Sequence, residues 1–152
     1  MLHISPLGLL RPAPDNIQRF TKLNSILNCI QDSGGNIAIP AYSYSYTKNE
    51  TYDIRSTPST LDETHEFLRK NNINKRTADA NFSYLIFGDE FSDNHLSVSD
   101  HSTFEKNSLI DEVYNKDSYL GAVGGVLEYL TEMHYLERKL NASYRFGKFF
   151  KG

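Results

Sequence analysis

A continuous apolar run, FSYLIFG at residues 82–88, constrains the fold of this chain more than any other stretch. An uninterrupted apolar segment of this length, ended by a glycine, is typical of a strand buried on both faces. A second extended run, NIAIPAYSYS at 36–45, has the branched and aromatic residues of a strand. Pro40 marks a strand end or a bulge in it, because proline cannot donate to a ladder. Two such strands need helices to cover them.

Helical patterns lie before and after these runs. Apolar residues recur at three- and four-residue steps from Ile17 to Ile30, with Asp15 as a cap and SGG as a stop. Thr60 and Glu63 have capping-box spacing, which predicts a helix introduced by residues 58–60.

The second half of the chain continues the alternation. Ser108 is expected to open a short helix, and SYLGAVGG at 118–125 a short strand that closes in a glycine turn. Residues 89–106 have no period and are expected to be a loop, while Val126–Leu140 predicts a strong helix. Strands alternating with helices predict an α/β domain with a layered mixed sheet flanked by helices, and 152 residues suit a single domain.

Composition narrows the class of protein. With 39% hydrophobic residues, 23% charged residues and a net charge of -3, the chain has the balance of an ordinary soluble protein, and no basic excess argues for nucleic acid. Three prolines break the apolar start, so no membrane segment is expected. The lone Cys29 excludes a disulfide within the chain and favours a reducing compartment, with the cytoplasm as the expected location. Cys29 falls in an apolar stripe and is expected to be a small core residue rather than a nucleophile.

The most suggestive chemical group is His134 in LTEMHYLERKL, residues 130–140. Thr131 and Glu137 lie three residues to either side of it and would share its helix face. A carboxylate beside an imidazole fixes its tautomer and suits a general base near neutral pH. The same spacing also occurs in ordinary helix-surface pairs, so spacing alone leaves both interpretations open.

Other constellations predict structure more than chemistry. No His-x-x-x-His pair lies on an expected helix, so no metal site is predicted. Gly121, Gly124 and Gly125 lack phosphate-loop spacing and indicate a turn. Alternating tyrosines such as Tyr42 and Tyr44 commonly pack on a strand or line its edge.

Three segments in order resemble the aminoglycoside 3-N-acetyltransferase family, in particular its members from surface-polysaccharide gene clusters that acetylate amino sugars. GGNIAIPAYSYSYTKNETYDIRSTPSTL is similar to the family's glycine-started strand, its proline followed by Tyr and Ser, and its later Thr-Pro-Ser. KRTADANFSYLIFG resembles a segment ending in Phe-Ser before a strand, and LTEMHYLERKLNASYRFGKFFKG resembles the Thr-x-x-His-x-x-Glu helix and its Tyr-Arg tail. The resemblance covers residues from about 34 to 152.

The resemblance implies an α/β fold distinct from the GNAT fold and an acetyl-CoA-dependent N-acetyltransferase acting on an amino sugar, either an aminoglycoside or a nucleotide-linked sugar. Acetyl-CoA would be a co-substrate, and antibiotic resistance or polysaccharide biosynthesis the biological setting. The implied catalytic residues are His134 as general base, Glu137 as its orienting partner and Asp79 as an auxiliary carboxylate. The implied contacts to acetyl-CoA are Ser5, Ser43, Ser83 and Thr131, and those to the acceptor are Tyr42, Tyr44 and Ser45.

The chain departs from the family pattern at several places. Ala80 stands where proline is usual, and Asp62 where glycine is common after Thr-Pro-Ser. The family's first strand and His-Ser loop are represented at most by His3 and Ser5, and family members continue beyond KFFKG, so the domain is expected to be incomplete at both ends. The alternative is an inactive, truncated remnant that binds CoA or a sugar or associates with an intact homologue. A homo-oligomer is compatible with the sequence.

Overall fold

The computed structural model describes residues 1–4, 15–72, 75–91, 93–97, 102–125 and 130–147. Within these residues the chain is a small α/β protein with four α-helices and four short strands. The strands are β1 (Leu2–Ile4), β2 (Ile37–Pro40), β3 (Tyr84–Phe87) and β4 (Gly121–Val123). The α-helices are α2 (Asn16–Asp32), α3 (Glu63–Asn71), α4 (Leu109–Asn115) and α5 (Met133–Lys139), with 3-10 turns η1 (Tyr46–Lys48) and η3 (Asp93–Leu96).

The strands form two small sheets. β1 and β4 pair in parallel, whereas β2 and β3 pair antiparallel, with Ile37 opposite Phe87 and Pro40 opposite Tyr84. β1 packs beside β2, and Leu2 and Ile4 share a core cluster with residues of β2. The predicted layered α/β class is therefore confirmed, but the described strands make two hydrogen-bonded pairs instead of one continuous mixed sheet.

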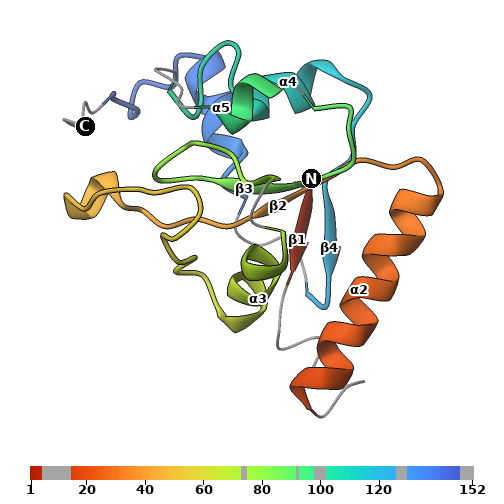
Figure 1. The fold of residues 1–152 in the computed structure, drawn as a ribbon. Helices are drawn as coiled ribbons and strands as arrows, with labels where there is room; N and C mark the ends of the chain where they lie inside the picture. Colours follow the sequence, from red (N-terminus) through yellow and green to blue (C-terminus); the bar gives the residue numbers. More distant parts are fainter. Residues whose placement is uncertain (5–14, 73–74, 92, 98–101, 126–129, 148–152) are drawn as a thin grey trace.

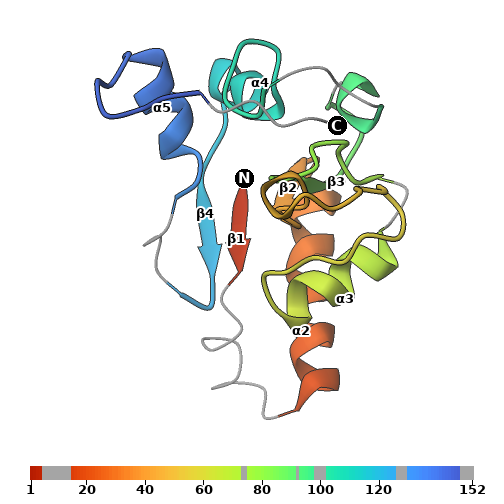
Figure 2. The same ribbon diagram turned by 90° about the vertical axis from the view of Figure 1, so that its left-hand side faces the viewer.

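Helices cover both faces of the β2–β3 pair, as Figures 1 and 2 show, with α2 and α3 on one side and α4 and α5 on the other. Successive residues of β3 point alternately into the two layers. Leu85 joins the core cluster on the α2 and α3 side, whereas Tyr84 and Ile86 join the cluster on the α4 and α5 side. This double burial explains why FSYLIFG is apolar without interruption.

Local signals placed several elements correctly. The Asp15 carboxylate accepts a hydrogen bond from Gln18 N at 2.8 Å and caps α2, and the Ser108 hydroxyl accepts one from Asp111 N at 3.1 Å and caps α4. Gly124 has a φ of 78°, as the predicted glycine turn after β4 requires. Pro40 is the last residue of β2, so the expectation of a strand end there is confirmed.

The start of α3 corrects one expectation. The helix begins at Glu63, and its cap is Asp62, whose Oδ1 accepts hydrogen bonds from Thr64 N at 2.8 Å and His65 N at 3.1 Å. Thr60 does not cap it, because its N–H and its hydroxyl both donate to the Tyr42 carbonyl at 2.8 and 3.2 Å. A contact with the segment that continues β2 has thus replaced the capping box.

Three further expectations are corrected. The last helix was expected from residue 126, but residues 126–129 lie outside the described ones and α5 begins only at Met133. Cys29 is exposed rather than in the core, since the buried face of α2 runs through Leu23 and Leu27 and residue 29 turns away from it. The stretch expected to be a featureless loop contains the 3-10 turn η3.

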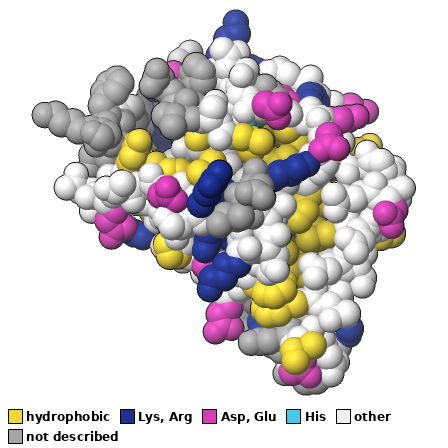
Figure 3. Space-filling view, viewed as in Figure 1, with side chains coloured by type: hydrophobic (Ala, Val, Ile, Leu, Met, Phe, Trp, Pro, Cys, Tyr) yellow, Lys and Arg dark blue, Asp and Glu magenta, His cyan; other side chains and the backbone are white. Residues whose placement is uncertain are grey.

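The outer surface keeps apolar groups uncovered. Figure 3 shows hydrophobic side chains in a band across the face seen in Figure 1. Across the described residues, no helix combines the length and the apolar character needed to cross a membrane.

Candidate active site

His134 and Glu137 form a pair on α5. The imidazole Nδ1 lies 2.9 Å from Glu137 Oε2, one helical turn further along the chain. The His134 side chain is 37% exposed and that of Glu137 22%, so a ligand could reach the ring from solvent. A neutral ring protonated on Nδ1 would donate to this carboxylate and leave Nε2 as the acceptor.

Two residues of the tail that follows α5 complete this cluster. The Tyr144 hydroxyl donates to Glu137 Oε1 at 2.9 Å. The Arg145 guanidinium contacts the same carboxylate and His134 Nδ1, and its Nη2 lies 3.5 Å from Nε2. The hydrogen bond from His134, with those from Tyr144 and Arg145, lowers the pKa of Glu137 below its usual value. Glu137 is therefore ionised at neutral pH.

A row of aromatic rings connects His134 to the β2 end. The Phe104 ring meets the imidazole edge-on, with centroids 5.5 Å apart, and Phe82 lies 5.2 Å from Phe104. Tyr42 and Tyr44 both pack against Phe82, at 5.2 and 5.3 Å. The structure thus brings both predicted acceptor tyrosines to the same aromatic row as His134.

The two tyrosines differ in accessibility. Tyr42 is only 3% exposed, and its hydroxyl lies 2.7 Å from the hydroxyl of Tyr84. Burial is the main cause that raises the pKa of the Tyr42 hydroxyl far above its usual value, so the hydroxyl stays protonated. Tyr44 is half-buried and has a φ of 56°, an uncommon conformation for a residue with a side chain. Of the two, Tyr44 is the one that a ligand could touch without a rearrangement.

The predicted serines are buried and hydrogen-bonded inside the protein. Ser43 Oγ donates to the Ala80 carbonyl at 2.8 Å, and Ser45 Oγ donates to Ser43 Oγ at 3.1 Å. Ser83 Oγ donates to the Ala41 carbonyl at 2.8 Å. The hydroxyls of Ser43 and Ser83 would have to leave their acceptors before they could donate to acetyl-CoA, and that of Ser45 before it could donate to the acceptor sugar. Ser5 lies outside the described residues.

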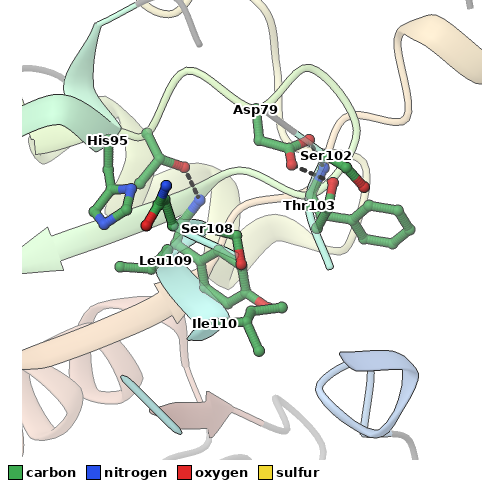
Figure 4. A pocket seen from close by; sticks show the side chains of 11 residues that line it. Asp79, His95, Ser102, Thr103, Ser108, Leu109 and Ile110 are labelled. Atoms are coloured by element: carbon green, nitrogen blue, oxygen red, sulfur yellow. Dashed lines mark hydrogen bonds between the residues drawn. The ribbon is translucent and has the colours of Figure 1, made fainter. Parts of the chain in front are cut away.

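Asp79 lines a small cavity that Phe82 of the aromatic row lines as well (Figure 4). Its Oδ1 accepts hydrogen bonds from Asn81 N and Phe82 N at 2.8 and 2.7 Å, and the Thr103 hydroxyl donates to Oδ2. The cavity, about 30 Å³, has room for roughly one water molecule. No hydrogen bond or ion pair joins Asp79 to His134 within the described parts of the chain.

Thr131 and Glu132 lie just before α5. An interaction with the Thr131 side chain partly offsets the raised pKa of Tyr42, which places Thr131 beside the aromatic row. Sequence reasoning missed Glu132, whose carboxylate is held by His3 and Tyr84. It also gave no role to Phe104, whereas Arg145 belongs to the quoted Tyr-Arg tail and could have been found from it.

A larger open hollow of about 290 Å³ lies elsewhere, lined by residues of the β3–η3 region such as Lys75, Ile86 and Phe91. His134 lines neither of these two cavities. Within the described ranges, no three His, Cys, Asp or Glu side chains are grouped so that they could hold a metal ion.

Comparison with known proteins finds no match for this chain. The chain matches no protein-family model, no curated protein and no solved structure.

Proposed function

We propose that this protein is an acetyl-CoA-dependent N-acetyltransferase that acts on the amine of an amino sugar, with His134 as the general base. The observation that carries the proposal is the 2.9 Å contact between His134 Nδ1 and Glu137 Oε2 at a half-exposed position. The resemblance of three sequence segments to the aminoglycoside 3-N-acetyltransferase family supports the substrate class, and the fold of that family is part of the proposal. A cytoplasmic location accords with a single exposed thiol and with a co-substrate made inside cells.

The proposed chemistry needs one proton acceptor at the ring. The sugar ammonium loses a proton to His134 Nε2, and its nitrogen lone pair forms a bond to the thioester carbon. The Glu137 carboxylate stabilises the resulting imidazolium through Nδ1. The carbon–sulfur bond then breaks, the imidazolium returns a proton to the departing CoA thiolate, and the newly acylated nitrogen releases its second proton to solvent. The products are an acetamide and free CoA.

The other predicted residues fit the proposal to different degrees. Tyr44, half-buried at the end of the aromatic row, can present its ring to a sugar. Asp79 accepts the backbone N–H of Phe82 and so fixes a ring of that row. Thr131 is partly exposed and lies three residues before the base, which suits a contact to the acyl group. Ser43 and Ser83 remain proposed contacts that would require their hydroxyls to turn.

The test is release of the CoA thiol from acetyl-CoA in the presence of a panel of amino sugars. His134→Gln should lower kcat by about 100-fold or more, because removal of a general base typically costs 10²–10⁴. His65→Gln is a matched control, since His65 Nδ1 forms a similar pair with Asp62 at 2.7 Å on a different helix. Equal rates in the wild type and His134→Gln would contradict the assignment of the base.

A second candidate is a protein that binds CoA or an amino sugar without transferring the acetyl group. The position of Arg145 favours it, since a guanidinium lies against both ring nitrogens, where a substrate ammonium would have to approach. This candidate predicts a thermal shift with acetyl-CoA or with an amino sugar, but no thiol release with any acceptor. At 100 times its dissociation constant, a bound ligand should stabilise the fold by about 2.7 kcal/mol. No shift with saturating acetyl-CoA would contradict the acetyltransferase, and no shift with acetyl-CoA or with any amino sugar would contradict both candidates.

A further inference from the structure

A buried carboxylate joins the segment before α5 to two strands. Glu132 Oε1 and Oε2 both lie 3.1 Å from His3 Nε2 on β1. The Tyr84 hydroxyl on β3 donates to Glu132 Oε1 at 3.1 Å, and the Tyr42 hydroxyl lies 2.7 Å from that of Tyr84. The Glu132 side chain is only 13% exposed.

The presence of an ionisable side chain at this largely buried position requires a physical explanation. Burial of an ionised group is costly unless it is paired and hydrogen-bonded, and an apolar side chain would fill the same space more cheaply. Burial opposes the ionisation of Glu132, but the hydrogen bond and charge of His3, with the hydrogen bond from Tyr84, hold its pKa below the usual value. The groups that face it are His3, the amino group of Met1, Tyr84 and Tyr42. Glu132 is therefore ionised and fixed in place.

The anchor lies at the start of the helix that carries the base. Glu132 is the N-cap residue of α5, yet its side chain makes no capping hydrogen bond to the helix and reaches across to β1 and β3 instead. Backbone hydrogen bonds of this turn run from His134 N to the Thr131 carbonyl at 3.0 Å and from Tyr135 N to the Glu132 carbonyl at 3.1 Å. Glu132, which hydrogen bonds to β1 and β3 hold in place, is therefore the residue from which the chain enters the turn that carries His134.

We propose that Glu132 is a positioning residue for His134. Its carboxylate, hydrogen-bonded to His3 and Tyr84, fixes the first turn of α5. In the resulting orientation the imidazole faces Glu137 and the edge of Phe104. The inference rests on the proposed function for its catalytic meaning. The orientation of the His134 ring, however, can be measured without any catalytic turnover.

The experiment compares the wild type with Glu132→Gln in protein labelled with ¹⁵N in its histidines. The ¹⁵N shifts of the His134 ring report which nitrogen carries the proton. In Glu132→Gln the balance between the Nδ1–H and Nε2–H tautomers should differ from that of the wild type, because the Glu137 contact loosens. In the thiol-release assay kcat should fall about 10- to 100-fold, as for a misplaced catalytic group, while KM for acetyl-CoA stays within twofold.

Glu112→Gln is the matched control. Glu112 Oε2 lies 2.7 Å from His95 Nε2, and its side chain is 18% exposed, so it resembles Glu132 in partner and burial but belongs to α4. It should leave the His134 ring shifts unchanged. If Glu132→Gln does not fold, Tyr84→Phe removes one hydroxyl from the anchor and should move the same shifts in the same direction by less.

The outcomes separate the two proposals. Unchanged His134 ring shifts in Glu132→Gln, or in Tyr84→Phe where only that variant folds, would overturn the positioning role. An inactive wild type whose ring shifts still respond to Glu132→Gln would instead contradict the acetyltransferase proposal and leave the positioning role supported.

Discussion

Arg76 is a fully buried cation that no carboxylate neutralises through a hydrogen bond in the described part of the chain. Its guanidinium donates to Ser83 Oγ at 3.1 Å, to the Ala41 carbonyl at 2.8 Å and to the Thr57 carbonyl, and it lies over the ring of Tyr52. One side chain therefore joins the end of β2, the loop before α3 and the start of β3. The same contacts keep Ser83 turned into the protein.

Replacement of this side chain should be costly. Arg76→Met would remove the donors to the Thr57 carbonyl and the Ser83 hydroxyl, and one of the two donors to the Ala41 carbonyl. Since each unsatisfied group costs about 1–3 kcal/mol, the free energy of unfolding should fall by roughly 2 kcal/mol or more. Urea unfolding followed by circular dichroism measures the loss. Arg138→Ala serves as the control, because Arg138 pairs with Glu105 at an exposed position and should cost at most about 1 kcal/mol. Equal losses in both variants would show that the Arg76 contacts do not stabilise the fold.

At the scale of the element, local patterns predicted what depends on local contacts. The stripe of α2, its Asp15 cap and the apolar run of β3 follow from residues close in sequence, and the structure confirms them. The starts of α3 and α5 were missed because distant partners decide them. Thr60 is bonded to the Tyr42 carbonyl, and Glu132 is bonded to His3, 129 residues earlier in the chain.

The cap of α3 offers a direct test of that distinction. Asp62→Ala should lower the free energy of unfolding by about 1 kcal/mol, the usual cost of losing an N-cap, whereas Asp62→Asn should retain most of the capping. Thr60→Ala should cost less than Asp62→Ala, since the Thr60 N–H still reaches the Tyr42 carbonyl. Urea midpoints of the three variants decide the matter. A larger loss for Thr60→Ala would restore the capping box expected from the sequence.

At the scale of the whole molecule, two core clusters on opposite sides of the β2–β3 pair hold the layers together. The candidate site spans segments from the end of β2 to the tail after α5, and its aromatic row depends on contacts between them. Spacing alone predicted the His134–Glu137 pair because both lie on one helix. The Phe104 edge and the hydrogen bonds that hold the hydroxyls of Ser43 and Ser83 could not be predicted, since each depends on a partner far away in sequence.

The acid response also belongs to the whole molecule, because partly buried carboxylates in separate elements share one property. The pKa values of Asp62, Glu66, Glu112 and Glu132 all lie below their usual 3.8 or 4.5. Hydrogen bonds and charges from neighbours such as His65, Arg69, Lys116 and His3 lower them, against burial that opposes ionisation. In acid the unfolded chain therefore binds more protons than the folded one.

It follows that the free energy of unfolding should stay nearly level from neutral pH to about pH 5.5, and fall as the pH drops through the usual carboxylate values toward the lowered ones. Urea unfolding between pH 3 and pH 7 measures the curve. Glu132→Gln should reduce stability near neutral pH and flatten part of the acid fall, because its buried carboxylate no longer titrates. Asp32→Asn, an exposed change at the end of α2, should leave the curve as it is. A wild-type curve that stays flat to pH 3, or an equally steep fall in Glu132→Gln, would mean that this carboxylate does not stabilise the folded chain through its charge.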